Sequence, residues 1–195
     1  MAGPAVASEV ASPAGIARDL ALAPSVRAGA RVSAEPVRTV LLTGATGHLG
    51  RHLLMALLHG GVERVICLVR ASSAAAGLTR LRDRLGAALT PALAERVHVV
   101  VGDLARPAMG MGDAAWGALV DSADALVLNG AAVNFEQPYV DLRDTNVVSW
   151  RDALGVAAER GTPVHLVSTW AVFSSGAHAG QPVAESDWPR ALPSG

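Results

Sequence analysis

The sequence predicts an α/β fold, a doubly wound parallel sheet of at least five strands, and two observations support this. Five short runs of apolar residues recur along the chain, and segments with the apolar spacing of amphipathic helices separate them. Runs that are apolar throughout, rather than alternating, are typical of parallel strands buried on both faces. Strands that alternate with helices form a parallel sheet covered by helices on both sides.

The first residues, 1–37, are rich in Ala, Pro, Ser and Gly, so we expect a loose leader with a short helical piece near Ile16–Leu22. The predicted domain occupies residues 38–195, and we find no internal repeat or second domain. The five predicted strands are Thr39–Leu42, Val65–Val69, Val97–Val101, Ala125–Leu128 and Val164–Val167.

Helices are predicted between these strands. The first, Leu49–Leu58, ends at the glycine pair that follows His59, because glycine stops helices. The second, Ala74–Leu89, carries leucines on one face. A short helix at Ala114–Ser122 and a long one at Tyr139–Arg160 follow, and a Gly-, Pro- and Ser-rich tail comes after the last strand.

Composition excludes several classes of protein. With 195 residues, 51% hydrophobic and 17% charged, the chain is long and apolar enough for one folded domain and is not of the disordered class. A net charge of −1 favours neither a nucleic-acid nor a membrane-surface partner. The chain shows no apolar run of membrane-span length and no signal peptide, and its one cysteine, Cys67, fits a reducing cytoplasm.

A glycine-rich loop joins the first predicted strand to the first helix, where a dinucleotide-binding fold places its phosphate-binding turn. Gly44 allows the tight turn, Gly47 lets the backbone approach a pyrophosphate, and Gly50 lets the helix pack against the strand. Amides at the helix N-terminus then face the phosphates. We assign these loop residues to cofactor binding: Thr43, Gly44, Thr46, Gly47, His48, Leu49 and Gly50. The alternative is a glycine-rich turn without a ligand.

The end of the second strand predicts NADP rather than NAD. An NAD site usually carries an acidic residue here, whereas Val69 is followed by Arg70. A guanidinium binds a 2′-phosphate by charge-assisted hydrogen bonds, and Arg80, in the next helix, could be a second clamp. The alternative for both arginines is a solvated surface charge.

Two further strand ends supply candidate cofactor contacts. Asp103 and Leu104 follow the third strand, where the carboxylate could accept a hydrogen bond from the adenine amino group or cap the next segment. Asn129, Gly130 and Ala131, with Ala132 after them, follow the fourth strand, where small residues let the backbone lie against a cofactor or form a simple turn.

As a set, these stretches resemble the thioester reductase branch of the extended short-chain dehydrogenase/reductase superfamily, the terminal reductase domains of nonribosomal peptide synthetases and carboxylic acid reductases. The resemblance covers roughly residue 19 to the end. The matching segments, in order, are Val40–Gly47, Val65–Ala71, Gly102–Leu104, Asn129–Ala131, Pro138–Tyr139, Asn146–Val147, Val167–Thr169 and Val172–Phe173.

The resemblance implies a Rossmann-type NAD(P)-binding fold and NADPH-dependent reduction of an acyl thioester, held on a phosphopantetheinyl carrier protein, to an aldehyde or an alcohol. It implies a catalytic hydroxyl at Thr169, with Ser168 as a substitute, and assigns Asn146 to the cofactor site. A turn cap is the alternative for Thr169. We expect no metal site, since His48 and His52 lack a third ligand nearby.

The sequence departs from that family where the family has a catalytic Tyr-x-x-x-Lys pair. The chain contains no lysine, and its one tyrosine, Tyr139, matches another position. We therefore expect an incomplete dinucleotide-binding domain without the substrate domain, inactive by itself. Rival interpretations are a sugar epimerase or dehydratase, and a non-catalytic NADP-binding protein or remnant.

Overall fold

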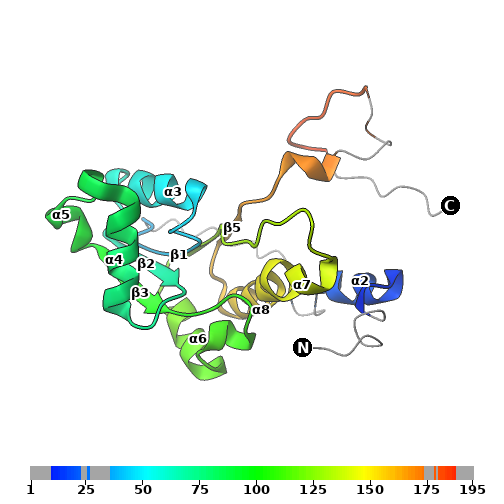
Figure 1. The fold of residues 1–195 in the computed structure, drawn as a ribbon, viewed down its shortest axis with the longest axis horizontal. Helices are drawn as coiled ribbons and strands as arrows, with labels where there is room; N and C mark the ends of the chain where they lie inside the picture. Colours follow the sequence, from blue (N-terminus) through cyan, green and yellow to red (C-terminus); the bar gives the residue numbers. More distant parts are fainter. Residues whose placement is uncertain (1–9, 23–25, 27–35, 174–177, 179, 188–195) are drawn as a thin grey trace.

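The computed structural model describes residues 10–22, 26, 36–173, 178 and 180–187. Its centre is a five-stranded sheet in the order β3-β2-β1-β4-β5, and each neighbouring pair is parallel (Figure 1). The strands are β1 (Thr39–Thr43), β2 (Arg64–Val69), β3 (Val97–Val101), β4 (Ala125–Leu128) and β5 (Val164–Leu166). The predicted doubly wound α/β fold is confirmed.

Helices follow the strands in the predicted alternation. They are α2 (Pro13–Leu20), α3 (His48–His59), α4 (Ala74–Leu85), α5 (Pro91–Ala94), α6 (Asp113–Asp121), α7 (Tyr139–Arg143) and α8 (Ser149–Arg160). Short 3₁₀ turns lie at Gly86–Ala88, Pro107–Gly110 and Trp170–Phe173, and a π-helical segment, η3 (Asp144–Val148), joins α7 to α8.

Two hydrophobic clusters, one on each face of the sheet, explain why neighbouring residues of a strand are both buried although their side chains point to opposite faces. In β1, Val40 and Leu42 pack in the cluster that includes Leu54 of α3 and Leu81 of α4. Leu41 belongs to the opposite cluster, with α6 and α8, where Trp116 is 1% exposed. Side chains alternate between the faces of a strand, so helices on both faces require apolar residues at every position.

The boundaries of β3 and β4 are those predicted, but three helical segments differ. The helix from Ala74 ends at Leu85 rather than Leu89, because Gly86 takes a positive φ of 55° and stops it. A separate helix, α5, then begins after Thr90, whose hydroxyl accepts a hydrogen bond from Leu93 N. The predicted helix Tyr139–Arg160 has its predicted ends but contains the π-helical segment η3.

The predicted leader is described only in part, and most of it lies outside the described residues. Its helix, α2, begins three residues before the predicted Ile16, at Pro13, where the Ser12 hydroxyl accepts a hydrogen bond from Gly15 N at 3.1 Å. It is not loose: Asp19 is 5% exposed and is paired with Arg143. The contact partner lies 124 residues away along the chain, so composition gave no sign of it.

In the described part of the chain, none of the helices has the length and apolar character needed to cross a membrane.

Candidate cofactor site

A pocket of about 470 Å³ lies at the carboxyl ends of β1 to β4. Thirteen of the predicted cofactor residues line it: Gly44, Thr46, Gly47, His48, Leu49, Gly50, Arg70, Arg80, Asp103, Leu104, Asn129, Gly130 and Ala131. Ligands of open parallel sheets bind at this edge, at the point where the order of the strands reverses. In the order β3-β2-β1-β4-β5, that reversal falls between β1 and β4.

The glycine loop has the backbone geometry that its sequence predicts. Gly44 has a φ of 71°, and a Cβ there would lie 2.7 Å from Gly130 Cα. A Cβ on Gly50 would lie 1.9 Å from the Gly44 carbonyl oxygen, so α3 packs directly on the turn. Gly47 starts α3 without a side-chain cap, which leaves the first amides of the helix facing the pocket. This uncapped backbone is a cradle for a phosphate group.

Thr43 does not line the pocket; instead, it ties the ends of two strands together. Its hydroxyl oxygen accepts hydrogen bonds from Asn129 N at 3.0 Å and Gly130 N at 2.9 Å. The Asn129 side chain in turn donates to the carbonyls of Thr43 and Gly44, each at 3.4 Å. The loop after β4 is therefore fixed against the glycine loop by bonds across 85 to 87 residues.

Arg70 and Arg80 lie together at the end of β2, because the Arg80 guanidinium donates a hydrogen bond to the Arg70 carbonyl oxygen. Both side chains are exposed and both line the pocket. This arrangement gives the pocket a positively charged end.

Asp103 also lines the pocket, but its carboxylate already accepts a hydrogen bond from Ala105 N at 3.0 Å. This is the capping alternative of the sequence analysis. A carboxylate has four lone-pair sites, so one such bond leaves acceptor capacity toward the pocket.

Asn146 does not line the pocket; it holds a residue that does. Its Oδ1 accepts from Ala132 N at 2.7 Å and its Nδ2 donates to Ala132 O at 2.8 Å. Trp150 Nε1 donates to the Gly130 carbonyl at 3.1 Å. Thus η3 and α8 together support the loop after β4.

The two predicted catalytic hydroxyls are exposed and do not line the pocket. Thr169 Oγ1 accepts from Ala171 N at 3.2 Å, so its side chain caps the turn Trp170–Phe173. Ser168 precedes it, also exposed. The catalytic roles of both residues remain predictions.

Sequence reasoning missed several pocket residues: Leu68, Val69, Gly102, Val133 and Thr145. Val69, Gly102 and Val133 directly adjoin predicted contacts in the sequence, and Leu68 is one residue further away, so adjacency could have found them. Thr145 lies in the π-helical segment, which no local pattern in the sequence predicts.

Among the described residues, no three His, Cys, Asp or Glu side chains are grouped so that they could hold a metal ion. His48 and His52 pack edge to face, with ring centroids 5.6 Å apart. Burial raises the pKa of the Cys67 thiol to about 12, which makes it a poor nucleophile.

Comparison with known families also indicates a nucleotide cofactor site in this part of the chain. The model of the NAD-binding family described as Male sterility protein matches residues 42–188, most of the chain. The chain belongs to this family. Pocket residues from Gly44 to Thr145 all fall inside the matched region of the Male sterility protein family.

Similar proteins agree with the predicted resemblance to synthetase reductase domains. Isonitrile lipopeptide synthase of Streptomyces coeruleorubidus is 42% identical over 160 residues, which are 79% of this chain and 11% of that protein. The terminal R domain from the myxalamid PKS-NRPS pathway superposes with a TM-score of 0.81 at 33% identity, over 95% of this chain and 47% of that one.

The reductase (R) domain of a nonribosomal peptide synthetase from Mycobacterium tuberculosis superposes with a TM-score of 0.57 at 31% identity. The match covers 86% of this chain and 39% of that one. The chain therefore spans less than half the length of these relatives.

Proposed function

We propose that this chain is the NADPH-binding part of a reductase that acts on acyl thioesters held on a phosphopantetheinyl carrier protein. The observation that carries the proposal is the pocket that the glycine loop, Arg70 and the loop after β4 form together. The family match and the reductase domains among its relatives support the same assignment.

The residues of the pocket fit NADPH. The uncapped N-terminus of α3 would hold the pyrophosphate, because its free amides and the helix dipole favour negative charge. Arg70 and Arg80 would hold the 2′-phosphate and Asp103 the adenine amino group. At the other end, Ala131 and Ala132 would lie against the nicotinamide, which supplies a hydride when bound.

For the substrate we propose Thr169, or less favourably Ser168, as hydrogen-bond donor to the thioester carbonyl oxygen. A threonine hydroxyl is too weak an acid to protonate the oxygen on which negative charge develops. A positioned general acid contributes roughly 10²–10⁴-fold. Tyr139 does not serve as this general acid, since burial and the bond to Asp19 raise the pKa of the Tyr139 hydroxyl. We infer that a Tyr-x-x-x-Lys pair outside this sequence provides the proton.

The test follows NADPH absorbance with acyl-pantetheine thioesters, beside a calorimetric titration of NADPH. We expect the 195-residue chain to bind NADPH without oxidising it. A longer protein that adds the Tyr-x-x-x-Lys pair and a substrate region should turn over, and Thr169→Ala in it should reduce the rate. Turnover by the 195-residue chain would show that other residues are catalytic, and absence of NADPH binding would overturn the proposal.

We also propose that the protein works in the cytoplasm, where its single cysteine stays reduced.

A further inference from the structure

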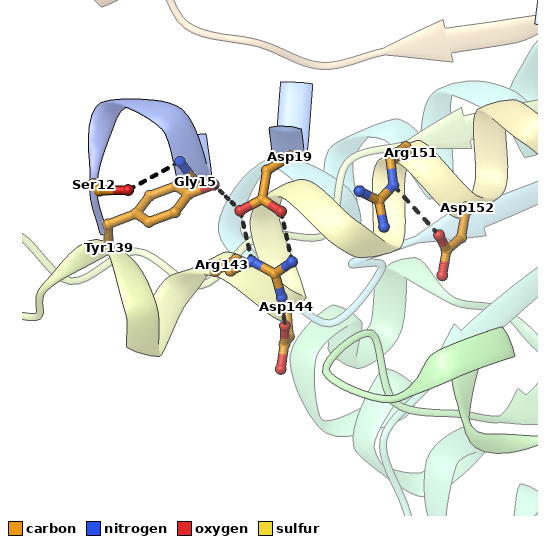
Figure 2. Close-up of polar contacts among 8 residues, drawn as sticks. All are labelled: Ser12, Gly15, Asp19, Tyr139, Arg143, Asp144, Arg151 and Asp152. Carbon is orange, nitrogen blue, oxygen red and sulfur yellow. Dashed lines mark hydrogen bonds and ion pairs between the residues drawn. The ribbon is translucent and has the colours of Figure 1, made fainter. Parts of the chain in front are cut away.

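A cluster of three polar side chains, Asp19, which is buried, and Tyr139 and Arg143, which are partly buried, ties α2 to α7, where the predicted helix Tyr139–Arg160 begins. Asp19 of α2 receives two hydrogen bonds from the Arg143 guanidinium, Nε to Oδ2 at 2.6 Å and Nη2 to Oδ1 at 2.5 Å. The Tyr139 hydroxyl donates to Asp19 Oδ2 at 2.8 Å (Figure 2). Both partners lie on α7, so α2 is fixed against this one helical turn.

The cluster is built as a strong contact rather than a chance surface pair. Asp19 is 5% exposed, and two-bond pairing with a guanidinium fixes both orientation and distance. The Arg143 guanidinium lowers the pKa of the Asp19 carboxyl to about 2, although burial opposes the shift. Removal of Arg143 would leave the buried Asp19 carboxylate without this charged partner, which is costly, whereas Arg143 is partly exposed and also pairs with Asp144.

The cluster is connected to the cofactor pocket through the helix that carries it. Arg143 is the last residue of α7, and η3 begins at the next residue. In η3, Thr145 lines the pocket and Asn146 makes two hydrogen bonds to the backbone of Ala132, which also lines it. π-helical segments are rare and are found at functional sites more often than elsewhere.

Among the described residues, this support from α7 and η3 reaches one end of the pocket. Arg70 and Asp103 follow β2 and β3, on one side of β1, whereas Ala132 follows β4, on the other side. Within the proposed function, the first side holds the adenosine with its 2′-phosphate, and the second side holds the nicotinamide.

We infer that Asp19, Tyr139 and Arg143 are positioning residues for the nicotinamide end of the pocket: by fixing α7 they set η3, and through Asn146 they set the backbone of Ala132. The inference rests on the proposed function, because it assumes that NADPH occupies the pocket. It assigns a role in cofactor binding to a helix, α7, none of whose residues lines the pocket.

The test compares two ligands on the 195-residue chain by calorimetry. NADPH spans the whole pocket, whereas 2′,5′-ADP occupies the adenosine side alone. We expect Asp19→Asn to weaken NADPH about tenfold, equivalent to about 1.4 kcal/mol, and to change 2′,5′-ADP affinity less than about twofold. Tyr139→Phe, which removes one hydroxyl from the cluster, should show the same selectivity with a smaller loss.

Two controls separate positioning from general destabilisation. Asp121→Asn removes the pair of Asp121 with Arg160, 2.6 Å long, between α6 and α8, and should leave both affinities unchanged. In an Asn146→Ala background, Asp19→Asn should add less than about twofold to the NADPH loss, because the link is already cut.

The outcomes distinguish the inference from the function beneath it. If the unsubstituted chain binds neither ligand, the proposed function fails. If it binds both, three results would overturn the inference. The first is that Asp19→Asn and Tyr139→Phe weaken the affinities for NADPH and 2′,5′-ADP equally, and the second is that neither variant changes the affinity for NADPH. The third is that the losses of NADPH affinity from Asp19→Asn and Asn146→Ala are additive.

Discussion

At the scale of single residues, the proposed preference for NADPH depends on Arg70, since an acidic residue at its position would repel a 2′-phosphate. We expect the chain to bind NADPH more tightly than NADH. Arg70→Ala should remove most of this preference, because it removes the charge-assisted bond to the 2′-phosphate. We expect a loss of about 1.5 kcal/mol, the lower end for such a bond, since the side chain is exposed and solvent screens its charge.

Calorimetric titration of both cofactors measures this preference. Arg82→Ala is the matched control, since Arg82 lies on the same helix, is exposed and does not line the pocket. Equal affinities for the two cofactors in the unsubstituted chain, or an unchanged preference in Arg70→Ala, would contradict the assignment.

Residues of the site were predictable where their signal is local. Gly44 and Gly50 have the geometry expected of them, since the turn and the helix start lie within seven residues. The bond from Gly130 N to Thr43 and that from Trp150 to Gly130 were not predictable, because both depend on strand order and helix placement. The bonds of Asn146 to the backbone of Ala132 were not predictable either, because they also depend on the fold; its assignment to the cofactor stays a prediction.

At the scale of helices and strands, the anchoring of α2 has a measurable pH dependence. The pKa of Asp19 is lowered from 3.8 to about 2 in the folded protein. The stabilisation is therefore complete above pH 4 and is lost as the pH falls through 2, and it amounts to about 2 kcal/mol.

Urea unfolding at a series of pH values tests this. The free energy of unfolding of the unsubstituted chain should fall more steeply between pH 4 and pH 2 than that of Asp19→Asn, which cannot titrate at this position. Parallel curves for the two proteins would show that Asp19 contributes no such linkage.

The helices and strands also show which boundaries can be predicted from the sequence and which cannot. The limits of β3 and β4 followed from apolar runs bounded by polar or small residues, a local pattern. To predict that α4 ends before Gly86, one would need to know that the φ angle of this glycine is positive. The π-helical segment η3 has no pattern of its own in the sequence. The position of α2 depended on a partner 124 residues away.

At the scale of the whole molecule, one edge of the sheet, as far as the structure describes it, is the strand β5. Among the described residues, β5 pairs with β4 alone, and Leu166 on it is 44% exposed. Unpaired apolar edges invite association of one chain with another. We therefore expect concentration-dependent self-association and a marginal melting temperature.

Sedimentation velocity over a range of concentrations tests this expectation. Leu166→Lys should reduce association, because a charge on an edge strand opposes pairing. Val183→Lys replaces a residue of similar exposure, 43%, outside the sheet and should have no effect. A monomer at all concentrations, with a sharp melt well above 60 °C, would refute the expectation.

The burial of Cys67 in the middle of β2 gives the molecule a built-in reporter. It is the only thiol in the sequence, it is 0% exposed, and its pKa of about 12 keeps it protonated at neutral pH. A thiol-specific reagent therefore labels only those molecules whose central sheet has opened. The labelling rate therefore reports how often the central sheet unfolds. It can be measured in any of the variants above without adding a probe to the chain.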